Sequence, residues 1–429
     1  MLALLLALQV AAPASDSAPA VTLAEALQRA AQLDPNYVSA LGQVDNAVWA
    51  RRSAFSVFIL PAVTVSASAT RNAPAFFNFD FVNPKFEKNA VQTQLSARYD
   101  LFTGGQKFAE LSRSGAALEG ARAGELVARF ATALLTESDY YAVLADRELA
   151  RVAQDRLRRA QQGVSVARAR VQSGAAVQTD SLQFLLERNR AQVGAVQQEA
   201  ALRESRLQLG RRVGHVGPVD AVPLDTVLMA ELPLPLVDAI AEAAQQGPQY
   251  RVAQANERAA RAVFRARLGA YLPQATLTWT DTRNDNQFYP DRRWLDALTL
   301  SISVPLWDNG RRELALTQAR VNRDVARAIR QDMDRAVQHD VTAAYDAYIT
   351  ARATYVLAVQ GLAVARENYR VQEARYRAGS TTILDILDAE LGLSESEAAL
   401  VQARYGTRLA LAGLEAILGR RLFTGKDTP

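Results

Sequence analysis

The sequence predicts a mainly α-helical protein with a β-barrel part, built by several copies of an internally duplicated chain. Three observations lead to this fold class. Residues recur in pairs about 205 positions apart, each half contains two strands with strict polar–apolar alternation, and each half contains a very long helical stretch without proline. A repeat of some 200 residues is too long for a solenoid unit, so one whole structural half is duplicated.

The duplication is marked by matching turn and helix-end residues. The pairs separated by 205 positions are Gly105 and Gly310, Arg170 and Arg375, Gly174 and Gly379, Asp180 and Asp385, and Gly214 and Gly419. Further upstream, Asp34-Pro35 corresponds to Gly247-Pro248 at an offset of 213. We therefore expect a first repeat at 15–215, a proline-rich linker region at 216–247, a second repeat at 248–419 and a flexible tail at 420–429.

Composition narrows the function classes. The chain has no Cys and two His, so disulfides, thiol nucleophiles and a histidine-based active site are not expected, nor are a metal or a cofactor. Lys and Arg (49) and Asp and Glu (45) are interspersed, which argues against a nucleic-acid surface. Residues 1–14 resemble a signal peptide, with an apolar run and Ala12-Pro13-Ala14, although no Lys or Arg precedes the run.

The first structured segments of each half are short helices and then strands. Thr22 and Glu25 form a capping-box pattern, and Asp34-Pro35 begins a second helix. Strands are expected at about 61–71 and 90–101, and again at about 273–282 and 296–306. An ordinary half-buried sheet would also alternate, but the polar face holds hydroxyls and amides, which favours a transmembrane barrel with a wet lumen. Four aromatic residues expected near strand ends would form a membrane-interface girdle: Phe102, Trp279, Trp294 and Trp307.

A long helix follows each strand pair. Helical periodicity runs from about 106 to 172 and from about 311 to 378, and each stretch would reach roughly 100 Å. Each ends at a glycine turn, after which a shorter helix returns at about 177–212 and 381–418. Narrow apolar seams along these stretches indicate coiled-coil packing rather than a globular core.

Four strands cannot close a barrel, and open strand edges are not tolerated in lipid. Closure therefore requires several copies of the chain. Three copies give twelve strands, which is an even number within the range of known barrels. The same three copies bring together a ring of helices that encloses a channel.

At this stage the chain resembles the TolC-like outer membrane efflux protein family, also called outer membrane factors. The resemblance covers nearly the whole mature chain and rests on Leu-Phe-Thr-Gly-Gly at 101–105, Leu-Trp-Asp-Asn-Gly at 306–310 and the segment 376–389. It implies a homotrimer with a TolC-like α-helical barrel and a twelve-stranded transmembrane β-barrel. The implied protein is a passive exit duct in outer membrane lipid whose helices extend into the periplasm, and it is not an enzyme. Its implied partners are a periplasmic adaptor and an inner-membrane RND, ABC or MFS transporter, in efflux or type I secretion.

The resemblance also implies a gate at the helical turns. Asp385 and Asp388 match two aspartates that ring the closed entrance of the family, and their spacing places both on one helix face. An acidic ring selects cations, but acids in the first turns of a helix also suit its dipole, so both interpretations stay open.

Further tip residues follow from the same comparison. Tyr376 matches a latch tyrosine, whereas Thr381 replaces an arginine of strongly latched relatives, so the latch is weaker or has moved to Arg377 or Arg375. Asp180 is expected to start the first return helix or to link hairpins. Gly174 and Gly379 are expected to mark the tips that dock the adaptor, and turn geometry alone also explains them.

Two other classes are weighed against the duct. A trimeric coiled-coil adhesin also contributes four strands per chain, but in one terminal block rather than in two internal pairs. A cytoplasmic coiled-coil scaffold would explain the helices but not the hydroxyl-faced strands. Recovery of the protein only in the cytosol would contradict the duct.

Overall fold

The computed structural model describes residues 18–78, 85–224, 231–285 and 293–423. The expected signal peptide, the end of the tail and the tips of both strand hairpins lie outside these residues. In the described ranges no helix is both long enough and apolar enough to cross a membrane.

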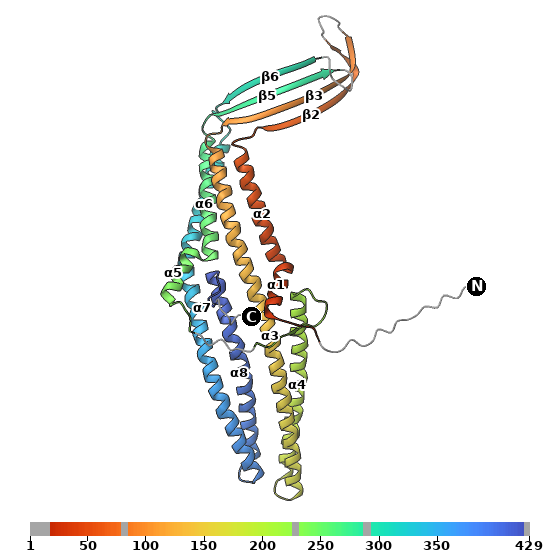
Figure 1. Cartoon of the computed structure of the whole chain (residues 1–429), viewed down its shortest axis with the longest axis vertical. Helices are drawn as coiled ribbons and strands as arrows, with labels where there is room; N and C mark the ends of the chain where they lie inside the picture. Colours follow the sequence, from red (N-terminus) through yellow and green to blue (C-terminus); the bar gives the residue numbers. More distant parts are fainter. Residues whose placement is uncertain (1–17, 79–84, 225–230, 286–292, 424–429) are drawn as a thin grey trace, which may run out of the picture. The chain divides into compact units, whose positions relative to one another are not determined.

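The elements of the two halves follow one another in the same order (Figure 1). The first half contains β1 (Ala20–Val21), α1 (Leu23–Leu33), α2 (Pro35–Ser56), β2 (Ala62–Asn78), β3 (Lys85–Phe102), α3 (Gln106–Gln172) and α4 (Gln178–Arg212). The region between the halves holds β4 (Asp220–Ala221) and α5 (Leu236–Gln246). The second half contains α6 (Pro248–Gly269), β5 (Gln274–Asp285), β6 (Arg293–Ser303), α7 (Arg311–Arg377) and α8 (Ile383–Leu418).

The chain forms two compact units, and each unit draws on both halves. One unit comprises residues 1–39, 126–247 and 337–429, and the other comprises 40–125 and 248–336. The duplication and the compact units are therefore different divisions of the same chain, because each half contributes its strands to one unit and its return helix to the other.

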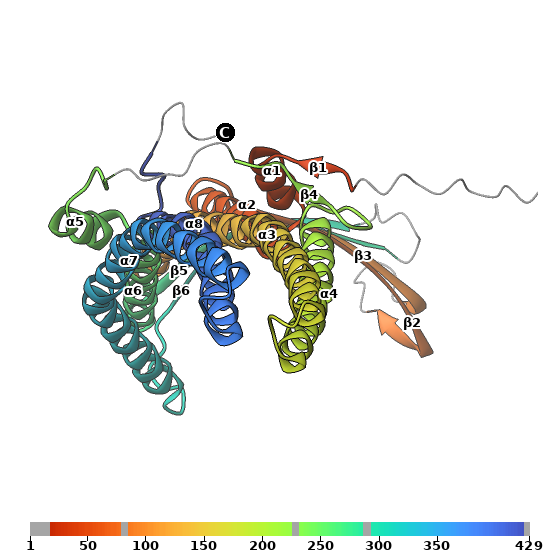
Figure 2. The same ribbon diagram turned by 90° about the horizontal axis from the view of Figure 1, so that it is seen from below.

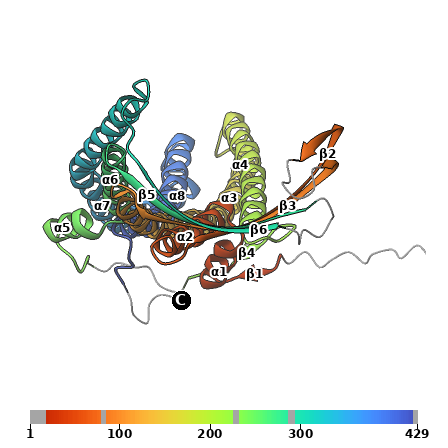
Figure 3. The same cartoon turned by 90° about the horizontal axis from the view of Figure 1, so that it is seen from above.

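The strand-bearing unit is built on one antiparallel sheet in the order β2-β3-β5-β6, seen from above in Figure 3. One cross-strand row joins Val63, Ala97, Trp279 and Leu298, and the next row joins Ala62, Arg98, Thr278 and Thr299. Apolar side chains on the first face stay open, with Val65 at 71% and Ile302 at 68% exposure. On the other face the hydroxyls of Thr64 and Ser96 hydrogen-bond across strands at 2.6 Å. Near the helices the sheet thus has one apolar and one hydroxyl-rich face. Further from the helices the first face is mixed, because Val65 and Leu95 share their row with Asp281 and Asp296.

The strands differ from the expected ranges at several ends. β2 continues to Asn78 and β5 to Asp285, whereas β6 ends at Ser303. Pro74 interrupts the alternation of β2, and the pairing register shifts between Arg71 and Phe76, so periodicity alone ends that strand too early. Trp279 is corrected by this result: it lies in the middle of β5 and pairs with Leu298, rather than near a strand end.

The junction between strands and helices is held by basic side chains and a close backbone approach. Lys107 donates to the carbonyl of Val57 at 3.0 Å and also to that of Asp100, while its ammonium lies 4.4 Å from the ring centre of Tyr99. Gly104 has φ +61, and a Cβ there would lie 2.1 Å from the carbonyl oxygen of Gly269. Only glycine fits this position, so the backbones of the two halves meet here.

The other unit contains two helical hairpins, one formed by α3 and α4 and one by α7 and α8, seen from below in Figure 2. The hairpins pack against each other through α3 and α8. Arg404 on α8 donates to the carboxylate of Glu148 on α3 at 2.9 Å, and Tyr405 donates to the same carboxylate at 2.8 Å. A charged, partly buried seam therefore joins the two halves within one chain.

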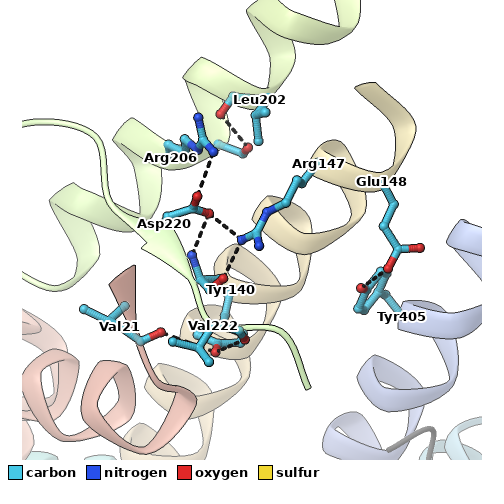
Figure 4. A network of polar contacts seen from close by, with 11 residues as sticks. Val21, Tyr140, Arg147, Glu148, Leu202, Arg206, Asp220, Val222 and Tyr405 are labelled. Carbon is cyan, nitrogen blue, oxygen red and sulfur yellow. Dashed lines mark hydrogen bonds and ion pairs between the residues drawn. The ribbon is translucent and has the colours of Figure 1, made fainter. Parts of the chain in front are cut away.

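A polar clasp joins the start of the chain to the linker region (Figure 4). β1 and β4 pair in parallel, and the Tyr140 hydroxyl donates to the carbonyl of Val222 at 2.7 Å. Asp220 accepts hydrogen bonds from Arg206 at 2.7 Å and from Arg147. These groups surround a core in which Tyr140 and Leu209 are fully buried.

Asp220→Ala is expected to destabilise the helical unit by about 2 kcal/mol, because it leaves two partly buried arginines without their shared acceptor. Asp332→Ala is the matched control, since the Asp332–Arg335 pair is exposed and exposed pairs contribute little. The measurement is the thermal unfolding midpoint in detergent. Equal shifts for the two variants would contradict the clasp.

Candidate functional site at the helical turns

The two helical turns have the same backbone geometry, 205 positions apart. Gly174 and Gly379 adopt φ +76 and +77, the left-handed region that favours glycine. The amide of Ala175 donates to the carbonyl of Arg170 at 2.8 Å, and the amide of Ser380 donates to that of Arg375 at 2.9 Å. Both long helices therefore end in the same glycine-dependent cap, as the turn signals indicate.

Asp385 belongs to the capping box at the start of α8, in which Thr382 is the N-cap residue. Its carboxylate accepts hydrogen bonds from the Thr381 and Thr382 hydroxyls, both at 2.7 Å, and from the Thr382 amide at 3.0 Å. The Thr382 hydroxyl in turn accepts from the Asp385 amide, which completes a capping box. Hydrogen bonds from Thr382 and Thr381 lower the pKa of Asp385 to about 2, so its carboxylate is ionised at neutral pH. The helix-start interpretation left open above is thus realised for this residue.

Asp388 lies one turn further along α8 and is exposed. No hydrogen bond or ion pair is recorded for its carboxylate within the described ranges. Leu384 and Leu391 flank it on the helix surface, with 65% and 44% exposure. Of the two aspartates, Asp388 is therefore the one whose carboxylate stands free in a single chain.

Tyr376 lies buried between the two hairpins. Its ring meets Phe184 of α4 edge-on at 5.7 Å and stacks under the guanidinium of Arg170 at 4.5 Å. Arg170 also donates to the main-chain carbonyl of Tyr376 at 2.6 Å. Burial, followed by the charge of Asp180, raises the pKa of Tyr376. Arg170 therefore links the two hairpins within one chain. The sequence identified this arginine only as one of the residues that recur at the 205-residue spacing.

Arg377 and Thr381 make local contacts in the single chain. Arg377 donates to Glu373 on its own helix at 2.5 Å, and the Thr381 hydroxyl serves the Asp385 cap. Asp180 lies in the first turn of α4, as its helix-start interpretation expects. None of these three side chains crosses between hairpins through a recorded hydrogen bond, so a latch role for them stays a prediction about contacts with other copies.

A buried acid beside the turns was missed by sequence reasoning. Glu390 is 2% exposed and lies 3.8 Å from the guanidinium Nε of Arg159, which also donates to Glu397 at 3.3 Å. Burial raises the pKa of Glu390 to about 7, and the charge of Arg159 opposes the shift. The burial of Glu390 could not be predicted, because the residues around it in the sequence resemble an exposed helix face with mixed charges. Its partner Arg159 lies on α3, far away in the sequence.

Close packing fixes the same region from the first hairpin. A Cβ on Gly163 would lie 2.4 Å from the ring of Phe184, and a cavity of about 20 Å³ remains beside these residues. Such a volume holds about one water molecule. Gly163 is therefore required by the approach of α3 to α4.

The remaining predicted site residues are exposed. Phe102, Trp294 and Trp307 are exposed by 48, 70 and 78%, and Trp279 by 37%. Within the part of the chain that the structure describes, no group of three or more His, Cys, Asp or Glu residues could hold a metal ion.

Comparison with known proteins agrees with this architecture. Residues 239–420 match the family described as outer membrane efflux protein. The pyoverdine export outer membrane protein OpmQ of Pseudomonas putida is 27% identical over 347 residues, covering 77% of this chain and 70% of that protein. The Campylobacter jejuni CmeC outer membrane channel has TM-score 0.79 at 15% identity, covering 92% of this chain and 85% of that one. The outer membrane protein VceC of Vibrio cholerae has TM-score 0.75 at 17% identity, covering 94% and 97%.

A four-stranded sheet and two long helical hairpins on one duplicated chain make up the TolC-like fold of the outer-membrane channels to which this chain is similar. Residues 239–420 thus match the outer membrane efflux protein family, and the chain as a whole is similar to outer-membrane efflux channels.

Gly163→Ala is expected to destabilise the hairpin tips by about 1–3 kcal/mol, because the added methyl overlaps the ring of Phe184. Gly194→Ala is the matched control: it lies in α4 with open space around it, so it should stabilise by roughly 0.5–1 kcal/mol through helix propensity. Thermal unfolding of both variants in detergent tests the contrast, and stabilisation by both would refute the packing argument.

Glu390 makes stability depend on pH in a defined window. The folded state holds the proton up to about pH 7, whereas the unfolded state releases it near 4.5, so this group's contribution to stability is lost as pH rises between these values. Glu390→Gln should remove that part of the slope. Unfolding midpoints from pH 4.5 to 8 provide the check, with the exposed Glu395→Gln as control. A slope unchanged in Glu390→Gln would show that another group titrates.

Proposed function

We propose that three copies of the chain form one passive exit duct, with a twelve-stranded barrel in the outer membrane and a helical barrel in the periplasm. The observation that carries the proposal is the sheet. Its edge strands β2 and β6 each pair on one side only within the described residues. Near the helices, one face of the sheet is apolar and the other carries hydroxyls. Lipid requires closure of such edges, and four strands are too few.

The proposal also includes two partner proteins. A periplasmic adaptor would dock at the exposed turns around Gly174 and Gly379, and an inner-membrane RND, ABC or MFS transporter would supply energy and cargo. The chain would itself contribute passage without catalysis. The similarity to OpmQ, a pyoverdine export outer membrane protein, supports a role in export. The internal position of both strand pairs argues against an adhesin or a scaffold.

The narrowest point of the duct would lie at the turns of the second hairpin. With three copies, Asp385 and Asp388 would place six carboxylates around one aperture, and acidic rings select cations. The contacts divide the roles within this ring. Asp385 is engaged by two threonines at the helix start, whereas Asp388 is exposed beside Leu384. Asp388 would therefore act most directly on passing ions.

Native mass measurement in detergent and planar-bilayer recording test the duct together: a trimer with ion conductance is expected. A stable monomer in membranes, or a trimer that never conducts, would overturn it.

Asp388→Asn is expected to weaken the cation preference and the block by divalent cations. It should leave the free energy of unfolding within about 0.5 kcal/mol of the unmodified protein, because the Asp388 side chain is exposed. Asp385→Asn should weaken the preference and also destabilise the tip, because the variant loses the ionised carboxylate of the capping box. Reversal potentials in a salt gradient measure the preference. Loss of selectivity in Asp385→Asn alone would reassign the filter to Asp385.

A further inference from the structure

A cavity lies at the junction between the strands and the helices of the strand-bearing unit. Its volume is about 490 Å³, which is within the range of ligand-binding pockets, and all its lining residues belong to that unit. The end of α2, the start of α3 and the last turns of α6 form its walls. Ala54, Val57, Ala262 and Val263 contribute apolar surface to it.

The polar lining of this cavity has an excess of positive charge. Lys107, Arg113 and Arg267 share the lining with two carboxylates, those of Asp100 and Glu110. Glu110 pairs with Arg113 at 2.5 Å, and Asp100 accepts hydrogen bonds from an arginine and a threonine of the sheet. Within the described residues, neither Lys107 nor Arg267 forms an ion pair. Two cations without a carboxylate partner therefore line one cavity, which favours an anionic ligand.

Lys107 holds its ammonium at the end of the apolar face of the sheet. The ammonium donates to the carbonyl groups of Val57, at 3.0 Å, and of Asp100, and it lies 4.4 Å from the ring centre of Tyr99. Tyr99 pairs with Leu277 on the apolar face. Since an ammonium has three donors, one remains for a ligand that approaches along this face.

The second half has a cation at the equivalent position, but that cation is neutralised. Arg312 is the counterpart of Lys107 at the 205-residue spacing, and it also lies over a tyrosine ring, 4.9 Å from the centre of Tyr271. Its guanidinium pairs with Asp308 at 3.1 Å. The counterpart of Asp308 is Thr103, which has no charge. The first half therefore lacks the carboxylate that neutralises this position in the second half.

Arg267 is likewise specific to this cavity. Because Leu60-Pro61 corresponds to Leu272-Pro273, the first-half position equivalent to Arg267 is Phe55, which is uncharged. The two unpaired cations thus have no unpaired counterparts at the equivalent positions of the other half. A requirement common to both junctions, such as joining strand to helix, does not explain them.

From these contacts we infer that the cavity binds the phosphate of a phospholipid headgroup at the periplasmic surface of the outer membrane. Lys107 and Arg267 would contact the phosphate oxygens, as basic pockets at membrane surfaces do. The inference rests on the proposed duct, whose barrel would place this junction at the membrane surface.

The apolar surroundings favour a lipid over a free phosphate ion. Ile59 and Leu60 follow the lining residue Val57, and Phe108 follows Lys107; these three side chains are exposed by 61, 63 and 70%. A free ion would leave them in water, whereas the acyl chains of a lipid would cover them. The cation beside exposed apolar side chains therefore matches both parts of an amphiphile.

Lipid retention by the native trimer tests the inference. The probe is phosphatidylglycerol added to the purified trimer in detergent, and native mass spectrometry counts the molecules that stay bound. We expect one tightly retained lipid per chain, because the second-half position is neutralised. Arg267→Gln should lower the affinity about fivefold, the change expected for one cation near an anionic lipid. Arg265→Gln is the matched control: Arg265 is exposed on α6 outside the cavity lining, so the affinity should stay unchanged.

Thr103→Asp tests the same site while Lys107 stays in place. The variant supplies the carboxylate that Asp308 provides in the second half, and it should lower the affinity by a similar factor. The local fold is preserved, because Asp308 accepts from the amide of Arg312 at 3.1 Å just as the Thr103 hydroxyl accepts from the amide of Lys107 at 3.3 Å.

The outcomes separate the possible explanations. Equal lipid affinity in the unmodified protein, Arg267→Gln and Thr103→Asp would overturn the inference. Displacement of the lipid by an equal concentration of inorganic phosphate would show that the site holds a free anion and would overturn the lipid as its occupant. Absence of trimers in the unmodified chain would instead overturn the proposed duct, so the two failures are distinguishable.

Discussion

Backbone pairing at the edges of the sheet is the constraint on which the rest of this structure depends. An unpaired backbone group in hydrocarbon costs several kcal/mol, and β2 and β6 each present one open edge in a single chain. In the proposed ring of copies, two similar halves repeated around an axis would give nearly equivalent strands and nearly equivalent helices, which accounts for the duplication of the chain. The apolar side chains that are open in a single chain would then meet lipid once the ring is complete.

The two halves keep their backbone and change their side-chain contacts. Both glycine turns have the same hydrogen bonds, but Arg170 is engaged and Arg375 is exposed. The same holds along the hairpins, where Arg159 lies among acids and Val364 lies open. In the proposed trimer, the two halves contact each other within one chain and also across neighbouring copies. These two contacts have different requirements, so the positions where the halves differ distinguish the contact within the chain from the contact between copies.

Sequence reasoning succeeded where the signal is local and periodic. The long helices follow from the absence of proline in α3 and α7, and the glycine turns follow from residues that only a left-handed backbone favours. It failed where partners are distant in sequence: the Glu390–Arg159 contact joins residues more than 200 positions apart, and the two-residue strands β1 and β4 are too short for any pattern. Asp385 is a third case. The spacing of Thr382 and Asp385 is a capping-box pattern, whereas the resemblance to the family drew attention to this aspartate mainly as half of an acidic ring.

The two-faced sheet has a consequence for how the protein is made. A single copy is unfavourable in both solvents, because water would contact its exposed apolar side chains and lipid would contact its unpaired strand edges. In the proposed trimer, partial assemblies would share both faults, so assembly and membrane insertion would be coupled. The number of finished ducts would then depend steeply on the local concentration of the chain, and a modest fall in its synthesis would lower that number more than proportionally.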